Sequence, residues 1–248
     1  MNPLRTALAA QLFGGVVAFA VIQLIRPQLW QLPLAAAAIQ GVCAALASHK
    51  LEAPAWWLPI HLAFMPLVVV AATLEIAPGW YLAGFLVLLL VFWRTDRSRV
   101  PLYLSNDATA AAVAAMLPSY PCHVADLGCG NGGFLRRLAK ARPDCEFVGI
   151  EHAPLPWLWA RLTAGRLPNC QVRYGDFWRT HLGLFEVVYA FLSPAPMAAL
   201  WAKARAEMRP GARLVSNSFA VPEVPPAEVA EVADRRNTRL FCYRPAPQ

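Results

Sequence analysis

The chain has 248 residues, with 22 basic and 15 acidic side chains and a formal net charge of +7. Hydrophobic residues make up 58% of it and the mean hydropathy is +0.42, values that exclude an ordinary soluble protein. The six cysteines form no C-x-x-C pair and no zinc pattern with histidine, so we expect no metal site, and a reduced compartment rather than a disulfide framework.

The hydrophobic excess lies before residue 94. The first 93 residues hold five charged side chains, namely Arg5, Arg26, Lys50, Glu52 and Glu75. The remaining 19 of the 22 basic and 13 of the 15 acidic residues follow them. This distribution predicts a membrane domain at residues 1–93 followed by a basic soluble region.

Four apolar runs predict four membrane helices, at residues 4–25, 32–47, 56–74 and 77–93. About 20 residues are needed to cross a bilayer, so the second and fourth runs are short and one of them could be re-entrant. A cleaved signal peptide over residues 1–25 is the alternative for the first run, and the three later runs argue against it.

Small residues recur four apart in the first two runs, at Gly14, Gly15 and Ala18 and at Ala37, Gly41 and Ala45. Such spacing lets membrane helices approach closely. We expect packing within the bundle, with docking of a partner helix as the alternative.

The distribution of basic residues predicts the orientation. With the N-terminus inside, Arg5, Lys50 and the cluster at 94–99 all lie on the cytoplasmic side, and Arg26 alone lies outside. We therefore expect a multi-pass protein of a bacterial-type inner membrane, or its equivalent, with the soluble region in the cytoplasm. No charged residue falls at mid-depth of a predicted span, which argues against a transporter.

The region after residue 93 begins with a basic juxtamembrane linker at 94–106 and continues as a domain over residues 107–248. Ser105 or Asn106 is the expected N-cap of its first helix. The expected helices cover 108–117, 134–141, 156–164 and 197–208, and the expected strands 123–127, 146–150, 170–174, 185–191, 213–219, 229–232 and 238–243. The predicted fold is thus an α-helical transmembrane bundle of about four helices followed by a Rossmann-like α/β domain.

A glycine-rich loop joins the first strand of this domain to the next helix, with the sequence D-L-G-C-G-N-G-G at 126–133. Gly128, Gly130 and Gly132 allow positive φ and let bare backbone approach a nucleotide-like ligand at the helix N-terminus. Cys129 lies where a small residue is needed, and we interpret it as a packing residue within this cofactor loop rather than a reactive thiol.

Three acidic residues, Asp126, Glu151 and Asp176, end successive predicted strands, at the edge where α/β sheets bind ligands. The interval between the first two suits an acid that binds ribose hydroxyls, with His152 beside it. Asp176 could accept from an adenine amino group while Phe177 or Trp178 covers the ring. A carboxylate before the first glycine would repel a pyrophosphate, but it suits a cofactor with an ammonium and a sulfonium, which favours S-adenosylmethionine.

Four motifs in order, D-L-G-C-G-N-G-G, G-I-E at 149–151, G-D-F-W at 175–178 and R-P-G at 209–211, resemble those of class I S-adenosylmethionine-dependent methyltransferases. The resemblance covers about residues 100–248. Within this class, the chain is similar to the membrane-anchored protein-lysine methyltransferases of mitochondria. The similarity lies in three features: the hydrophobic region ahead of the domain, V-P-L-Y-L-S at 100–105, and P-W-L at 156–158. Those methyltransferases act on the ATP synthase c-subunit and the adenine nucleotide carrier. The chain departs from that family at 152–157, where H-A-P-L-P-W replaces an Asn-Pro-Trp, and in its four predicted spans.

The resemblance implies roles for site residues. Asp126, with Gly128 and Gly130, would hold the methionine end of the cofactor, Glu151 the ribose, and Asp176 the adenine. The segment at 191–194 would face the transferred methyl group. Enzymes that methylate amides or nucleobase amines often carry Asn/Asp-Pro-Pro-aromatic there, so Ser193-Pro194-Ala195-Pro196 counts against those substrates.

A lysine amine must be neutral to accept a methyl group, and an apolar channel lowers its pKa by desolvation. Tyr103, Phe191, Ser193, Pro194 and Phe219 are the candidates to line that channel. Ser193 is the candidate catalytic residue, since its hydroxyl could orient the amine, although a simple turn residue explains it equally well.

We therefore predict an enzyme that transfers a methyl group from S-adenosylmethionine to an amine, with lysine of a membrane protein as the favoured acceptor. The alternatives are a lipid or apolar small molecule as acceptor, and a non-catalytic cofactor-binding membrane module. The three intact acids argue against the last. We expect the bilayer as a partner, and neither nucleic acid nor metal.

Overall fold

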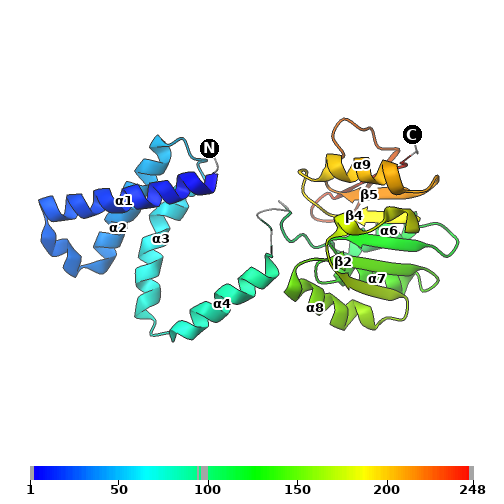
Figure 1. Cartoon of the computed structure of the whole chain (residues 1–248), viewed down its shortest axis with the longest axis horizontal. Coiled ribbons are helices and arrows are strands. Elements are labelled where there is room, and N and C mark those ends of the chain that lie inside the picture. Colours follow the sequence, from blue (N-terminus) through cyan, green and yellow to red (C-terminus); the bar gives the residue numbers. More distant parts are fainter. Residues whose placement is uncertain (1–2, 94, 96–99, 246–248) are drawn as a thin grey trace. The chain divides into compact units, whose positions relative to one another are not determined.

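The computed structural model describes residues 3–93, 95 and 100–245. It divides the chain into two compact units, Met1–Ala83 and Gly84–Gln248 (Figure 1). The basic cluster expected at 94–99 lies outside the described residues, apart from Thr95.

The first unit is helical, and prolines set where several helices begin. The elements are α1 (Pro3–Ile25), the 3₁₀ turn η1 (Pro27–Gln31), α2 (Pro33–Lys50), α3 (Trp57–Thr73) and the start of α4 (Pro78–Val91). Proline suits the first position of a helix because its missing N–H would have no partner there. The four predicted helices are present, with bounds that differ by up to three residues.

Glycines let α1, α2 and α3 approach closely. A Cβ added to Gly14 of α1 would lie 2.5 Å from Cα of Ala44 in α2, and one on Gly41 would lie 2.8 Å from the carbonyl oxygen of Leu62 in α3. At Gly15 no atom lies within 4 Å of such a Cβ. Packing inside the bundle is confirmed for Gly14 and Gly41.

Gly14→Val is expected to destabilise the helical unit by about 1–3 kcal/mol, because the new side chain must push α1 away from the α2 backbone. Gly15→Val is the matched control on the next residue and has open space for its side chain. The midpoint of thermal unfolding of the full chain in detergent compares them. Equal midpoints for the two variants would show that the close approach of α1 to α2 at Gly14 does not stabilise the helical unit.

The expectation of four membrane spans is wrong. Of the helices in the described part of the chain, only α1 is long and apolar enough to cross a membrane, over Arg5–Ile25. Helices α3 and α4 are apolar but have 17 and 14 residues, so α4 reaches only about 21 Å at 1.5 Å per residue, against a hydrocarbon core of about 30 Å. Helix α2 has 18 residues but includes the polar His49 and Lys50 in its last turn, and it is not a candidate span.

The second unit contains a seven-stranded sheet of order β3-β2-β1-β4-β5-β7-β6. Its strands are β1 (His123–Leu127), β2 (Glu146–Glu151), β3 (Cys170–Tyr174), β4 (Val187–Ala190), β5 (Arg213–Asn217), β6 (Glu228–Glu231) and β7 (Arg239–Tyr243). The first five are parallel, and β7 pairs antiparallel with β5 and β6. The order reverses at β1 and β4, which is where open α/β sheets bind ligands.

Alternation along the strands produces two buried layers. On β1, Val124 packs with α6 (Asp107–Met116), α7 (Gly133–Ala141) and α8 (Pro154–Thr163). Ala125 and Leu127 face the other layer, which contains α9 (Met197–Glu207). Figure 1 labels these helices and several of the strands.

Element bounds were predicted well, with three exceptions. Strand β5 ends at Asn217, two residues before the predicted end at Phe219. Strand β4 is shorter than the predicted 185–191, and Phe185 packs into the core ahead of it. Helix α8 begins at Pro154, two residues before the predicted start, because a proline can occupy a first helical position. Asn106 is the N-cap of α6, and its Oδ1 accepts from the Thr109 N–H at 2.8 Å.

Candidate active site

The glycine loop between β1 and α7 depends on left-handed backbone. Gly128, Gly130 and Gly132 have φ of +77°, +55° and +70°, a region that other residues adopt at a cost. Gly132 is the N-cap of α7, and a Cβ there would lie 2.9 Å from the Ala160 Cβ of α8. The first turn of α7 therefore stays close to both the sheet and α8.

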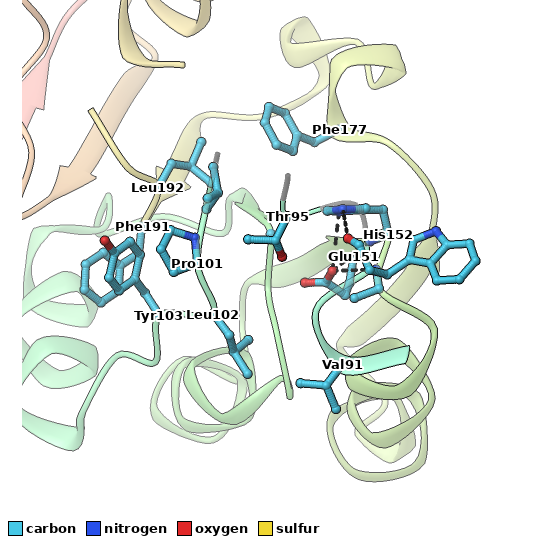
Figure 2. Close-up of a pocket in the computed structure, with 14 residues that line it drawn as sticks. Val91, Thr95, Pro101, Leu102, Tyr103, Glu151, His152, Phe177, Phe191 and Leu192 are labelled. Carbon is cyan, nitrogen blue, oxygen red and sulfur yellow. Dashed lines mark hydrogen bonds and ion pairs between the residues drawn. The ribbon is translucent and has the colours of Figure 1, made fainter. Parts of the chain in front are cut away.

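Glu151, the last residue of β2, fixes the loop from the neighbouring strand. Its Oε2 accepts from the Gly130 N–H at 2.9 Å, while its Oε1 accepts from the N–H groups of His152 at 2.9 Å and Ala153 at 2.8 Å. The residue is 6% exposed. Figure 2 shows Glu151 and His152 on one wall of a cavity. One carboxylate thus positions the glycine loop and the turn into α8 together.

His152 extends this wall. Its Nε2 lies 3.0 Å from the Trp93 carbonyl oxygen, and its Nδ1 lies 3.6 Å from Glu151 Oε1. The imidazole is therefore held at the cavity rim by contacts on both ring nitrogens.

Asp126 is a buried carboxyl group on β1. It is 3% exposed, and among the described residues we find no hydrogen bond to its oxygens. Burial, and then the nearby Glu151 carboxylate, raise the pKa of Asp126 to about 8. An acid held in this way gains most from a cationic ligand, because an opposite charge restores the ionised form.

Three aromatic side chains that we predicted for the substrate channel lie together. The Tyr103 ring stacks on Phe191 at a centroid distance of 4.9 Å and contacts Phe219 at 5.8 Å. Figure 2 shows the Tyr103 and Phe191 rings overlapping on the side of the cavity away from Glu151. Tyr103 and Phe191 therefore line one side of the cavity and Glu151 the other (Figure 2), and Gly128 also lines it.

The Ser193 side chain is placed differently from the prediction. It is 7% exposed, and its hydroxyl has no hydrogen-bond partner within the described part of the chain. Neither Ser193 nor the exposed Pro194 lines the cavity beside Glu151 or the small one beside Asp126. From this segment, the predicted Phe191 and the neighbouring Leu192 line the cavity beside Glu151.

Asp176 is exposed, and its Oδ1 accepts from the Trp178 N–H at 3.0 Å, which caps a 3₁₀ turn (η3, Phe177–Arg179). Within the described residues, no hydrogen bond reaches its Oδ2. Phe177 is 9% exposed and lines the cavity with Glu151. These positions leave an acceptor and a ring at the end of β3, next to the wall formed by β2.

Cys129 packs beneath the loop. A Cβ on Gly149 would lie 2.7 Å from its Sγ, which shows how closely the thiol approaches β2. Burial, followed by the charge of Asp126, raises the pKa of this thiol well above its ordinary value. Its geometry is that of a packing residue.

The segment at 100–105 covers the loop, and sequence reasoning gave it no such role. Leu102 and Leu104 would lie 3.2 and 3.4 Å from a Cβ on Gly130. Ser105 Oγ lies 2.7 Å from the hydroxyl of the buried Tyr189, which also accepts from Asn217 Nδ2 at 2.7 Å. The cavity that remains measures about 50 Å³. Sites for cofactors are typically several hundred Å³, so this segment must shift to admit one.

Comparisons with known proteins agree with this geometry. Residues 126–228, which include the loop, the three acids near strand ends and β4, match the family model described as the ANTKMT methyltransferase domain. The chain is 34% identical over 150 residues to the mouse adenine nucleotide translocase lysine N-methyltransferase, covering 55% of this chain and 64% of that relative. The chain carries a class I S-adenosylmethionine-dependent methyltransferase domain.

Two further matches concern shorter or more distant similarity. The Escherichia coli release factor glutamine methyltransferase is 45% identical over 40 residues, which is 16% of this chain and 14% of that protein. The chain thus spans less than two thirds of either curated relative. A Salinibacter ruber RNA methyltransferase in complex with S-adenosyl-L-homocysteine has the same fold, with a TM-score of 0.53, 21% identity, and coverage of 59% of this chain and 95% of that one.

Proposed function

We propose that the methyltransferase domain methylates the side-chain amine of lysine in a membrane protein. The observation that carries this proposal is the aromatic cluster of Tyr103, Phe191 and Phe219, in which Tyr103 and Phe191 line the same cavity as Gly128. The name of the mouse relative, a lysine N-methyltransferase of the adenine nucleotide translocase, supports the same choice.

The carboxylates near the strand ends fit the polar groups of the cofactor. Asp126, buried and with no hydrogen-bond donor in the described part of the chain, would accept from the ammonium at the cofactor's methionine end. Glu151 Oε2 accepts one backbone N–H and keeps a lone pair for a ribose hydroxyl. The free oxygen of Asp176 and the Phe177 ring would receive the adenine. S-adenosylmethionine supplies an electrophilic methyl group on a positively charged sulfur.

The protein's own contribution to this reaction is positioning and desolvation. The lysine nitrogen must approach in line with the bond that breaks, so that a C–N bond forms as the bonding electrons pass to sulfur. Tyr103 and Phe191 would exclude water from this path and lower the pKa of the amine, so that it arrives neutral. Their π-faces also favour the methylated cation that results.

The helical unit supports a substrate that comes from the membrane. Helix α1 is long and apolar enough to span, with only 22% of that window buried. Large apolar side chains of other helices in this unit are also exposed, such as Leu67 of α3 at 63% and Leu82 of α4 at 58%. We propose that α1 anchors the protein in the cytoplasmic membrane, with the methyltransferase domain in the cytoplasm.

The test is to incubate the full chain in detergent with host membranes and S-adenosylmethionine labelled in its methyl group. We expect label in protein, and methyllysine after acid hydrolysis. Asp126→Asn, which should bind the cofactor poorly, is the control for label transferred by other enzymes. Label confined to the lipid extract would overturn the lysine proposal and indicate the lipid alternative. Cofactor binding without any label transfer would indicate a non-catalytic module.

A further inference from the structure

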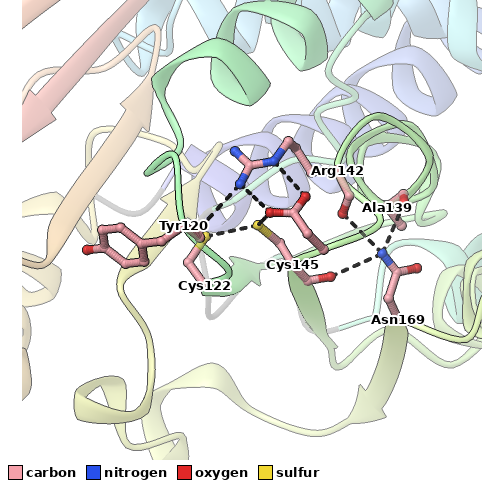
Figure 3. Close-up of polar contacts among 7 residues, drawn as sticks. Tyr120, Cys122, Ala139, Arg142, Cys145 and Asn169 are labelled. Atoms are coloured by element: carbon pink, nitrogen blue, oxygen red, sulfur yellow. Dashed lines mark hydrogen bonds and ion pairs between the residues drawn. The ribbon is translucent and has the colours of Figure 1, made fainter.

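Two buried thiols meet at the edge of the sheet opposite the cofactor loop. Cys122 directly precedes β1 and Cys145 directly precedes β2, and their Sγ atoms lie 3.2 Å apart. The two residues are 2% and 1% exposed. Figure 3 shows the pair between Tyr120 and Arg142. No other two thiols in the described residues make such a contact.

The backbone already has the spacing of a disulfide. The first paired residues of β1 and β2 are His123 and Glu146, and the Glu146 N–H donates to the Cys122 carbonyl at 2.9 Å. Neighbouring strands lie about 4.8 Å apart, within the roughly 4.4–6.8 Å between Cα atoms that disulfides require. The sulfurs need to move by only about 1 Å to reach the bond length of about 2.0 Å.

The surroundings hold the pair in place. The Cys145 thiol donates to Asp144 Oδ2 at 3.6 Å, and Arg142 Nη2 donates to the same oxygen at 2.6 Å. The Asn169 amide donates to the carbonyl oxygens of Ala139, Arg142 and Cys145 at 3.0, 3.2 and 3.1 Å (Figure 3). These contacts fix the turn from α7 into β2, and with it the position of Cys145 against Cys122.

We propose that Cys122 and Cys145 are a modification site, a dithiol that a small-molecule disulfide such as oxidised glutathione converts reversibly into an intramolecular disulfide. One protein thiol loses its proton and attacks glutathione disulfide, forming a mixed disulfide and releasing one glutathione. The second thiol then loses its proton and attacks the protein sulfur of that mixed disulfide, releasing the second glutathione. The two cysteines together lose two electrons and two protons, which end on the two glutathione molecules.

The reaction is expected to be slow at neutral pH. Burial and the Cys145 thiol raise the pKa of Cys122 to about 12; the Arg142 guanidinium opposes this shift and the Glu186 carboxylate adds to it. Only the thiolate attacks a disulfide. Local opening near Arg142 and Asp144, which lie on the solvent side, must therefore precede the exchange.

The link would stabilise the domain without changing its site. It closes the chain from 122 to 145, which contains the whole glycine loop and α7. Restricting the unfolded chain over such a loop should raise the midpoint of thermal unfolding by about 5–10 °C. Asp126 and Glu151 lie near the other ends of β1 and β2, so we expect the dissociation constant for S-adenosylmethionine to change less than about twofold.

The experiment exposes the full chain in detergent to glutathione buffers from fully reduced to fully oxidised. Free thiols are then capped with a maleimide that shifts gel mobility. We expect two of the six thiols to disappear together, and a peptide linking Cys122 to Cys145 in the mass spectrum. Dithiothreitol should restore both thiols and the lower unfolding midpoint.

Cys122→Ala and Cys145→Ala should each abolish the intramolecular link and leave at most a mixed disulfide with glutathione on the remaining thiol, whereas Cys170→Ala and Cys242→Ala, which remove other buried thiols, should leave the link intact. Should one alanine variant fail to fold, its serine counterpart and the second single variant serve the same comparison. Six free thiols in the wild type after equilibration with oxidised glutathione, or a link to any other cysteine, would overturn the proposal.

Discussion

Replacing Asp126 by asparagine is expected to weaken the binding of S-adenosylmethionine about 100-fold. The carboxylate is buried and has no donor among the described residues, so the cofactor's ammonium would be its main favourable charge. Removing one partner of a buried charge pair typically costs about 2–5 kcal/mol. Isothermal titration calorimetry gives the two dissociation constants directly.

Asp107→Asn is the control for a general charge effect, since that carboxylate is 83% exposed and pairs with Arg137 on the surface. We expect it to leave the dissociation constant unchanged. Equal affinities of wild type and Asp126→Asn would contradict the assignment of Asp126 to the ammonium.

The raised pKa of Asp126 also predicts proton release on binding. At pH 6.5 a carboxyl group with a pKa of about 8 is protonated in the free protein, and it must ionise to bind a cation. Calorimetry in two buffers of different ionisation enthalpy should therefore detect about one proton released. The affinity should rise by up to about tenfold per pH unit between pH 5.5 and 7.5. Asp126→Asn should show neither effect.

The same shift affects the stability of the cofactor-free protein with a definite sign. The folded pKa of Asp126 lies above the unfolded value of about 4, so the folded state keeps a proton that the unfolded state has lost. The free energy of unfolding must then fall as pH rises from about 4 to 8. Asp126→Asn should lack this loss and unfold at a higher temperature than wild type at pH 8.

Replacing Glu151 by glutamine is expected to destabilise the methyltransferase domain by about 2–4 kcal/mol and to reduce cofactor binding. The carboxylate accepts three backbone N–H groups, from Gly130, His152 and Ala153. A glutamine amide has one oxygen, so its NH₂ group must face at least one of these donors. Each buried donor left without an acceptor costs about 1–3 kcal/mol.

Glu146→Gln provides the matched control, because Glu146 begins the same strand and its side chain is 71% exposed beside His123. Chemical denaturation measures the free energies of unfolding, and calorimetry the cofactor affinity. A Glu151→Gln protein with wild-type stability would show that the glycine loop does not depend on this carboxylate.

The sequence determined much of the methyltransferase domain. Hydrophobic alternation located the strands, and the spacing of glycines and acids placed Asp126, Gly128 and Glu151 at one edge of the sheet. Such features are local, because a strand fixes where its last residue lies and a positive φ requires a glycine. The four early helices were also local features, marked by apolar runs between prolines and charged residues.

Only the tertiary structure decided the rest. Hydropathy could not separate a span from a short apolar helix, and the bounds of α3 and α4 reduced four predicted spans to one candidate. Other features depend on packing between segments that are distant in the sequence. They are the three N–H groups that donate to Glu151, the stacking of Tyr103 on Phe191, the position of Ser193 away from the cavity, and the contact of Cys122 with Cys145. Composition and residue spacing do not predict such contacts, because the contacts form only when the sheet brings separate strand ends together.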